Sequence, residues 1–230
     1  MTETFDHLFG GWHTAKARRW VNPDGSQGGI VAVDATLDPA LKIPGDAVVW
    51  PRASIGPRAS IGDGASIGDG ASIGDGASIG YGASIGPRAS IGYGASIGYG
   101  ASIGYGASIG PRASIGYGAS IGDGASIGDG ASIGDGASIG YGASIGDGDW
   151  FHFAGPFGAH RRVVTAVHSK EHGLRWWVGC QAGITTERFI KRLSESHASN
   201  GEADAVCREY AHLIGFVTTH PEVLKREAAR

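Results

Sequence analysis

The sequence predicts a mostly β chain in which very short strands and sharp corners wind into a coil, and three observations support this. Sixteen consecutive six-residue units of the form x-x-Ala-Ser-Ile-Gly run from residue 51 to residue 146. The two variable positions hold Asp-Gly, Tyr-Gly or Pro-Arg, which are pairs suited to a corner. Ala and Ile stand two residues apart in every unit, so both point to the same face of an extended chain.

Each unit divides into a strand, Ala-Ser-Ile-Gly, and a two-residue corner. Gly at the second corner position admits the positive φ that a sharp bend needs. In the Pro-Arg corners, Pro sets φ at about −65° and the Gly before it accommodates the proline ring. Strands and corners repeated in this way stack turn upon turn at a spacing of about 4.8 Å, with Ile columns inside.

The pattern continues upstream in a degenerate form. Residues 33–50 keep an aliphatic residue, Leu37, Ile43 or Val49, at the place that Ile takes later. Downstream, Phe151 takes that place in residues 147–152, where the pattern ends. We therefore expect a coil over residues 33–152.

The hexads resemble those of the hexapeptide-repeat family, the left-handed parallel β-helix. This resemblance covers about half of the chain. It implies a left-handed triangular prism with three hexads in each turn, and hence a little over six turns from residue 33 to residue 146. Because each turn contacts only its neighbours, we expect caps at both ends.

The flanking segments are predicted to supply these caps. Residues 1–32 form an N-terminal cap that contains a hairpin about the turn Asn22–Gly25. Residues 153–230 form a small α+β module with a hairpin over 161–180 and helices over 185–197, starting with a Thr cap, and 202–217. A last helical stretch is expected from Pro221.

The segment VGCQAGITTERFIKRL, followed by His197, is similar to the C-terminal module found after hexapeptide repeats in uncharacterised bacterial and phage proteins. That resemblance implies no activity. Cys180 and Cys207 are the only two cysteines, and their spacing fits neither a zinc site nor a redox pair. Together with the acidic start and the lack of a long apolar stretch, they predict a cytoplasmic protein with free thiols.

Composition excludes several partners and sites. The formal net charge is −3 and no basic stripe occurs, so neither nucleic acid nor an anionic membrane is expected as a partner. His152, His160, His168 and His172 follow one another at spacings that match no metal-ligand template. One Asp in a corner offers too few oxygens for calcium. No metal and no cofactor is expected, and Cys180 is read as structural rather than as a nucleophile.

Two alternative functions stay open. Hexapeptide β-helices are best known as acyltransferases, which place a general-base His in the groove between prisms and often cover the acyl donor with an excursion loop. Here no His falls between His13 and His152, and no hexad is interrupted. An ice- or surface-binding β-helix is the second alternative, although the outward positions hold Ser and Gly and lack paired Thr rows.

The eighteen-residue turn predicts which corners lie above one another. It aligns Tyr81, Tyr99 and Tyr117 in one column, either as an aromatic ladder or as a contact stripe. The same register would allow ion pairs between Arg58 and Asp75, and between Arg112 and Asp129. Surface contacts are expected from the three tyrosines and, in the C-terminal module, from Trp176 and Trp177.

The main functional prediction follows from an internal duplication. Residues 60–86 recur unchanged at 120–146, and this offset of sixty is not a whole number of turns, so the copy falls on another face of the prism. Faces that can be exchanged in this way are not expected to carry a functional site fixed on one face. The sequence therefore predicts a non-catalytic structural scaffold rather than an enzyme, with no catalytic residues. It self-associates as a homo-oligomer, and the family resemblance implies a trimer.

Overall fold

The structure is a computed structural model, and it describes residues 3–147, 150–157, 162–169, 173–178 and 185–197. The chain divides into two compact units, residues 1–148 and residues 149–230, and each is described by itself. Boundaries between a cap, a coil and a module at residues 32/33 and 152/153 stay predictions.

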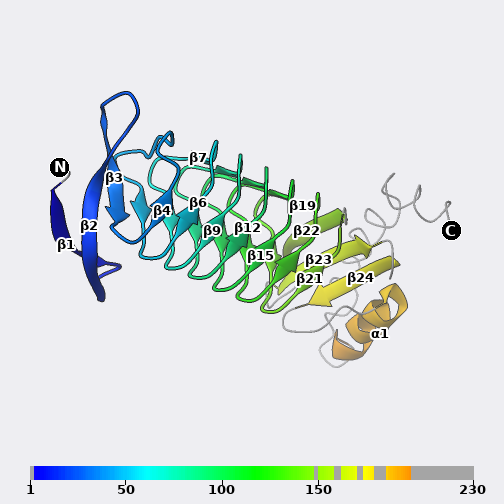
Figure 1. Cartoon of the computed structure of the whole chain (residues 1–230). Helices are drawn as coiled ribbons and strands as arrows, with labels where there is room; N and C mark the ends of the chain where they lie inside the picture. The colour runs from blue at the N-terminus through cyan, green and yellow to red at the C-terminus, as the bar shows by residue number, and fades with distance from the viewer. Residues whose placement is uncertain (1–2, 148–149, 158–161, 170–172, 179–184, 198–230) are drawn as a thin grey trace. The chain divides into compact units, whose positions relative to one another are not determined.

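From β4 onward the first unit is a coil of two-residue strands separated by turns (Figure 1). Its strands are β4 (Thr36–Leu37), β5 (Val48–Val49), β6 (Ser54–Ile55), β7 (Ser60–Ile61), β8 (Ser66–Ile67), β9 (Ser72–Ile73), β10 (Ser78–Ile79), β11 (Ser84–Ile85), β12 (Ser90–Ile91), β13 (Ser96–Ile97), β14 (Ser102–Ile103), β15 (Ser108–Ile109), β16 (Ser114–Ile115), β17 (Ser120–Ile121), β18 (Ser126–Ile127), β19 (Ser132–Ile133), β20 (Ser138–Ile139) and β21 (Ser144–Ile145).

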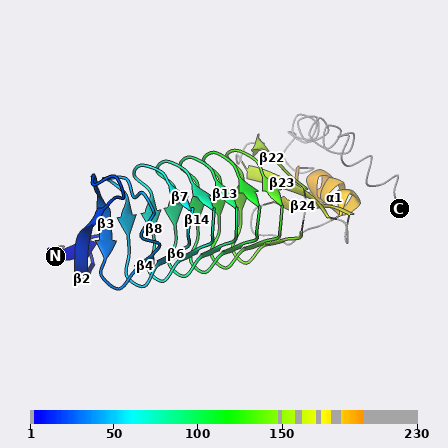
Figure 2. The same ribbon diagram turned by 45° about the horizontal axis from the view of Figure 1, so that its top comes forward.

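From β5 to β18, each strand pairs in parallel with the third strand after it in the chain, so the turns lie one behind another along the coil (Figure 2). The sheets run β5-β8-β11-β14-β17-β20, β7-β10-β13-β16-β19 and β4-β6-β9-β12-β15-β18-β21. Ser84 lies opposite Ser102, which confirms three hexads per turn. Leu37 lies opposite Ile55 and Val49 opposite Ile67, so the predicted register of the degenerate hexads is also confirmed.

The interior consists of the Ile and Ala columns, as predicted. Ile97 is 2% exposed, and all the other repeat Ile side chains are at most 5% exposed. The Ser between Ala and Ile points outward, as the period of two requires. Burial of each Ile contributes about 2 kcal/mol, and this contribution depends on the turns above and below.

The corners are closed by a backbone hydrogen bond, for example from the N–H of Ala65 to the carbonyl of Gly62 at 3.2 Å. Gly at the second corner position has the expected positive φ, such as 63° at Gly100. The Pro-Arg corners differ from the prediction, because the arginine itself adopts the left-handed backbone conformation. Arg52 has φ 59° and Arg88 has φ 57°. Pro-Arg therefore makes the same corner as Asp-Gly, at the cost of strain at a residue with a Cβ.

The Gly that ends each hexad is required for a different reason. Its φ is not positive, but a Cβ on Gly98 would lie 2.5 Å from the backbone carbonyl carbon of Gly116 in the next turn. Gly74 and Gly80 meet the same obstruction at 2.8 Å and 2.7 Å. At Gly74, Gly80 and Gly98 the next turn leaves no room for a side chain, whereas the degenerate turn before residue 51 carries Trp50 at this position.

The N-terminal cap is an antiparallel sheet of β1 (Thr4–Phe9), β2 (His13–Val21) and β3 (Gln27–Ala32), and β3 joins β5 of the coil in parallel. The hairpin about Asn22–Gly25 is confirmed, with the N–H of Gly25 donating to the Asn22 carbonyl at 2.9 Å. Strand β1 was not predicted. Trp20 is buried against the first turn and donates its indole N–H to the Leu41 carbonyl at 3.0 Å.

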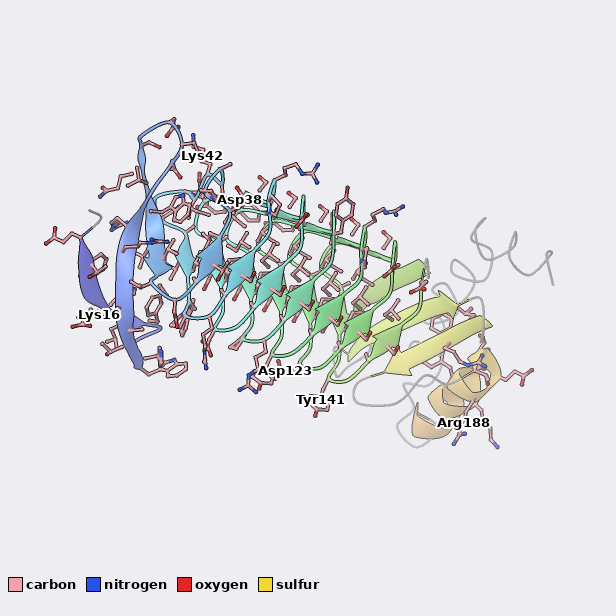
Figure 3. The ribbon with its side chains drawn as sticks, in the orientation of Figure 1. Lys16, Asp38, Lys42, Asp123, Tyr141 and Arg188 are labelled. Carbon is pink, nitrogen blue, oxygen red and sulfur yellow. The ribbon has the colours of Figure 1, made fainter. Side chains whose placement is uncertain are left out.

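The loop of this hairpin carries Asp24, an aspartate with a strongly lowered pKa. Asp24 accepts hydrogen bonds from the Ser26 hydroxyl and from the Ser26 N–H, and Lys42 lies 3.3 Å away. These hydrogen bonds and the Lys42 ammonium lower the pKa of Asp24 to about 2. Lys42 lies near the loop of the hairpin in Figure 3.

The second unit has an antiparallel sheet, β22 (Trp150–Phe157), β23 (Arg162–Ser169) and β24 (Gly173–Val178), and a helix α1 (Thr186–His197). The predicted hairpin and the first predicted helix are thus confirmed. Thr185 caps α1, since its hydroxyl accepts from the Arg188 N–H at 3.3 Å. In α1, Phe189 is buried, whereas Ile190 is 49% exposed.

The helices predicted over 202–217 and from Pro221 lie outside the described residues, as do Cys180 and Cys207. Whether the second unit matches the module of bacterial and phage proteins stays a prediction. In the described part of the chain, no helix combines the length and the apolar character that a membrane span requires.

Candidate functional site

The described imidazoles lie in the N-terminal cap. His7 is on β1 and His13 is on β2. His13 lies opposite Phe9 in the antiparallel register, and His7 stands two residues from Phe9, so all three share one face of the sheet. The His7 and Phe9 rings meet edge to face with centroids 4.6 Å apart. Imidazole takes up and releases protons near neutral pH, which makes these two residues candidates for acid-base work.

Two indole rings flank this face. We call His7, Phe9, Trp12, His13 and Trp50 the N-terminal aromatic cluster. Phe9 is fully buried under Trp50, with ring centroids 5.5 Å apart. Trp12 packs on Trp50 at 5.8 Å and on His13 at 5.8 Å, yet 74% of its surface is exposed. The cluster therefore presents an open aromatic wall beside an imidazole.

Local backbone geometry produces this wall. Gly10 has φ 57°, and a Cβ there would lie 2.7 Å from the Trp50 ring, so the β1–β2 turn needs Gly to bring Trp12 over Trp50. Trp50 occupies the place of the Gly that ends each later hexad, and its indole N–H donates to the Ser66 hydroxyl at 3.3 Å. Sequence reasoning missed this cluster because β1 was missed.

The predicted tyrosine column is present. Tyr81 stacks on Tyr99 with centroids 4.9 Å apart and planes inclined by 8°, and Tyr99 stacks on Tyr117 at 5.1 Å and 9°. We call these three residues the tyrosine ladder. About half of each side chain is exposed. Their expected role as a surface contact stays a prediction.

Some corner aspartates form hydrogen bonds to the backbone of the neighbouring turn. The N–H at the first corner position has no strand partner, and an Asp one turn further supplies an acceptor. Asp123 accepts from the N–H of Tyr105 at 2.8 Å and Asp135 from that of Tyr117 at 2.7 Å. Figure 3 shows Asp123 and Tyr141 on the same edge of the coil, at corners one turn apart.

Among the described corners of the coil, one ion pair joins two corners, but not at either expected place. Arg52 donates two hydrogen bonds to Asp69, and these bonds raise the pKa of the guanidinium above its ordinary value. In the described part of the chain no carboxylate lies within 4.0 Å of Arg58 or Arg112, so both expected pairs are wrong. Arg88 instead donates to the Tyr105 hydroxyl at 2.5 Å, with its guanidinium 5.6 Å from the ring centroid.

The predicted contact residues of the second unit are not brought together at its surface. Trp176 is fully buried, stacks on Phe189 at 4.9 Å and donates its indole N–H to the Thr186 hydroxyl at 2.8 Å. Burial removes Trp176 from the surface of the unit. Trp177 lies in β24, and the structure does not describe its side chain.

The histidines considered as metal ligands lie in the second unit. His152 and His168 lie in β22 and β23 with side chains that are not described, and His160 and His172 lie outside the described residues. Among the residues that the structure describes, no three His, Cys, Asp or Glu side chains gather closely enough to hold a metal ion.

Comparisons with known proteins give matches only among solved structures. No family model and no curated protein matches the chain. The acetyltransferase domain of PglB from Neisseria gonorrhoeae is 22% identical, with a TM-score of 0.41 over 56% of this chain and 55% of that one. The chain thus spans little more than half of this structure. A hexapeptide transferase family protein from Anaplasma phagocytophilum is 18% identical, with a TM-score of 0.31 over 82% and 95% of the two chains.

A UDP-N-acetylglucosamine acyltransferase from Francisella novicida is 21% identical, with a TM-score of 0.28 over 51% of this chain and 52% of that one. What these matches share with the present chain is the stacked coil, which its own eighteen-residue strand register establishes. The chain is a parallel β-helix built from hexapeptide repeats.

The matches correct two predictions about this hexapeptide-repeat protein. A non-catalytic scaffold, a structural protein rather than an enzyme, was expected. The solved structures to which the chain is similar include an acetyltransferase domain in complex with acetyl coenzyme A and an acyltransferase, so the prediction of a non-enzymatic scaffold is wrong. Exchangeable faces exclude a fixed site only within the repeat itself. A flanking segment or a second subunit can still supply functional groups.

Proposed function

We propose that this chain is an acyltransferase of the hexapeptide-repeat type, with its site between the subunits of a cytoplasmic homotrimer. The observation that carries the proposal is the N-terminal aromatic cluster, in which His13 lies against the exposed indole of Trp12 and His7 packs on Phe9 on the same face. The hexads of residues 51–146 offer Ser, Tyr, Asp and Arg but no His. A general base must therefore come from outside these hexads, and the cap supplies His7 and His13.

The chemistry assigned to the cluster is proton transfer. An acceptor amine or hydroxyl attacks the carbonyl carbon of an acyl thioester, and one imidazole takes the proton that the acceptor loses. The carbon–sulfur bond then breaks, and the imidazolium returns the proton to the leaving thiolate. Trp12 and Trp50 provide a wall on which a planar part of the donor can stack. Since Trp12 is largely exposed, a neighbouring subunit is needed to exclude water from this site.

Two experiments test the proposal. The purified chain is incubated with acetyl coenzyme A and a panel of amine and hydroxyl acceptors, and acetylated products are detected by mass spectrometry. We expect product in the wild type and a loss on the order of 100-fold or more in His7→Asn or His13→Asn. Thr14→Ala, on the other face of β2, is the control and should keep the activity.

Light scattering measures the assembly, and a trimer of this 23.5 kDa chain is expected. If no acceptor is acetylated and acetyl coenzyme A does not bind, the proposal is wrong. If activity is present but survives in both histidine variants, the assignment of the site to the cap is wrong.

A further inference from the structure

The tyrosine ladder occupies one of the three edges of the coil, and the corners on this edge have a distinctive charge. From the N-terminal side they hold Asp46, Asp63, the three tyrosines and Asp135. The four arginines of the repeat, Arg52, Arg58, Arg88 and Arg112, all lie on the other two edges. The ladder is therefore flanked by carboxylates and by no cation of the repeat. Arg19 of the cap reaches the start of this edge, where it donates to the Gly45 carbonyl at 3.1 Å.

The rings are accessible. Tyr81, Tyr99 and Tyr117 are 51%, 49% and 59% exposed. Their spacings of 4.9 Å and 5.1 Å exceed the roughly 3.5 Å of rings in full face-to-face contact, so part of each ring face stays open. Beside each ring the following residue is Gly, and a Cβ on Gly100 would meet nothing within 4 Å. The three rings therefore form an exposed aromatic strip, and the glycines beside them add no side chain that would cover it.

We propose that the tyrosine ladder binds planar aromatic cations, lying along the coil axis. The rings offer edge and face contacts to a flat ligand. The positive charge is attracted by the ring faces and by Asp63 and Asp135 beyond the two ends of the ladder. Tyr93 lies alone between Asp75 and Pro111 on another edge, so it offers one ring and no ladder.

The test uses thioflavin T, a planar aromatic cation, in a fluorescence titration of the full chain. The decisive variant is Tyr99→Asp, which removes the central rung and leaves Tyr81 and Tyr117 as separate rings. Asp-Gly is a corner that the chain already uses, for example at Asp63 and Asp135, so the variant should fold. Tyr93→Asp makes the same change at a similarly exposed tyrosine outside the ladder and is the matched control.

We expect saturable binding in the wild type, binding weakened on the order of tenfold in Tyr99→Asp, and unchanged binding in Tyr93→Asp. The added carboxylate in Tyr99→Asp would by itself strengthen cation binding, so a loss reports the rings. Exchange of Asp63 and Asp135 for Asn should weaken thioflavin T two- to fivefold and leave a neutral planar dye unaffected.

Three results would overturn the proposal. They are no saturable binding in the wild type, an equal loss in the two tyrosine variants, and tighter binding of the anionic dye 8-anilinonaphthalene-1-sulfonate than of thioflavin T. Circular dichroism confirms that each variant keeps its β signal. None of these readouts depends on acyl transfer, so the ladder and the proposed activity are tested separately.

Discussion

The carboxylate of Asp123 accepts a hydrogen bond from the backbone N–H of Tyr105, one turn earlier, at 2.8 Å. This side chain replaces a strand partner that the corner cannot have. Asp75 occupies an equivalent corner, but the residue one turn before it is Pro57, which has no N–H to donate. Asp123 therefore loses a hydrogen bond when it is replaced by Ala, whereas Asp75 has no such bond to lose.

We predict that Asp123→Ala lowers the free energy of unfolding by about 1 kcal/mol, the usual contribution of such a hydrogen bond. Asp75→Ala should change it by less than about 0.5 kcal/mol. Urea unfolding followed by circular dichroism measures both. Equal effects of the two substitutions would show that the carboxylates act through general charge rather than through the Tyr105 N–H.

The two kinds of glycine predict different penalties. Gly98→Ala places a Cβ 2.5 Å from the backbone of Gly116, and because backbone cannot move aside easily we expect a loss of about 3 kcal/mol. Gly100→Asn forces a left-handed φ of 63° on a residue that tolerates it, in open space, at about 1 kcal/mol. Midpoints of urea unfolding rank the two, and a greater loss for Gly100→Asn would contradict the steric explanation.

Asp24 predicts an acid dependence for the β2–β3 hairpin. Its pKa is lowered from 3.8 to about 2 by Ser26 and Lys42, so the folded protein holds the ionised form more strongly than the unfolded chain does. The stabilisation is complete above about pH 5, and it falls away as the pH drops from 4 to 2. Asp24→Asn should therefore lower the thermal midpoint at pH 6, and the difference from the wild type should shrink by pH 2.

Removal of one whole turn is predicted to be tolerated. Deletion of residues 63–80 takes out eighteen residues, joins Gly62 to Tyr81 and leaves the tyrosine ladder intact. Because each turn contacts only its neighbours, the shortened chain should fold and be about 4.8 Å shorter along the coil axis in X-ray scattering. It loses the Arg52–Asp69 pair, an exposed contact worth at most about 1 kcal/mol. Loss of the β signal in circular dichroism would contradict the idea that each turn contributes independently to stability.

Much of the coil could be predicted because one period determines it. Ala and Ile two residues apart fix the inward face, and the six-residue repeat places Ile97 above Ile79 once three units make a turn. The tyrosine ladder followed from the same arithmetic. The Asn22–Gly25 turn could be predicted from its own residues, since Pro-Asp-Gly between two β runs favours a hairpin.

The parts that were missed depend on contacts or strain rather than on period. Strand β1 mixes Phe5, His7 and Phe9 with exposed Asp6 and Leu8, and its only signal was Gly10-Gly11 ahead of the next run. Without β1 the aromatic cluster could not be assembled. The positive φ of Arg52 goes against its residue type, and only the fit of the whole corner imposes it. The Asp123 bond could have been found by asking which corner precedes each Asp by one turn.

The direction of the hydrogen bonds has a mechanical consequence. Bonds such as those from Ser96 to Ala113 and from Gly98 to Ile115 join one turn to the next, so they lie along the axis of the coil. A force applied to the two ends of the coil would strain a few of them at a time, and the protein should yield one turn after another at low tension. Every rupture would release eighteen residues, a gain in contour length of about 60 Å.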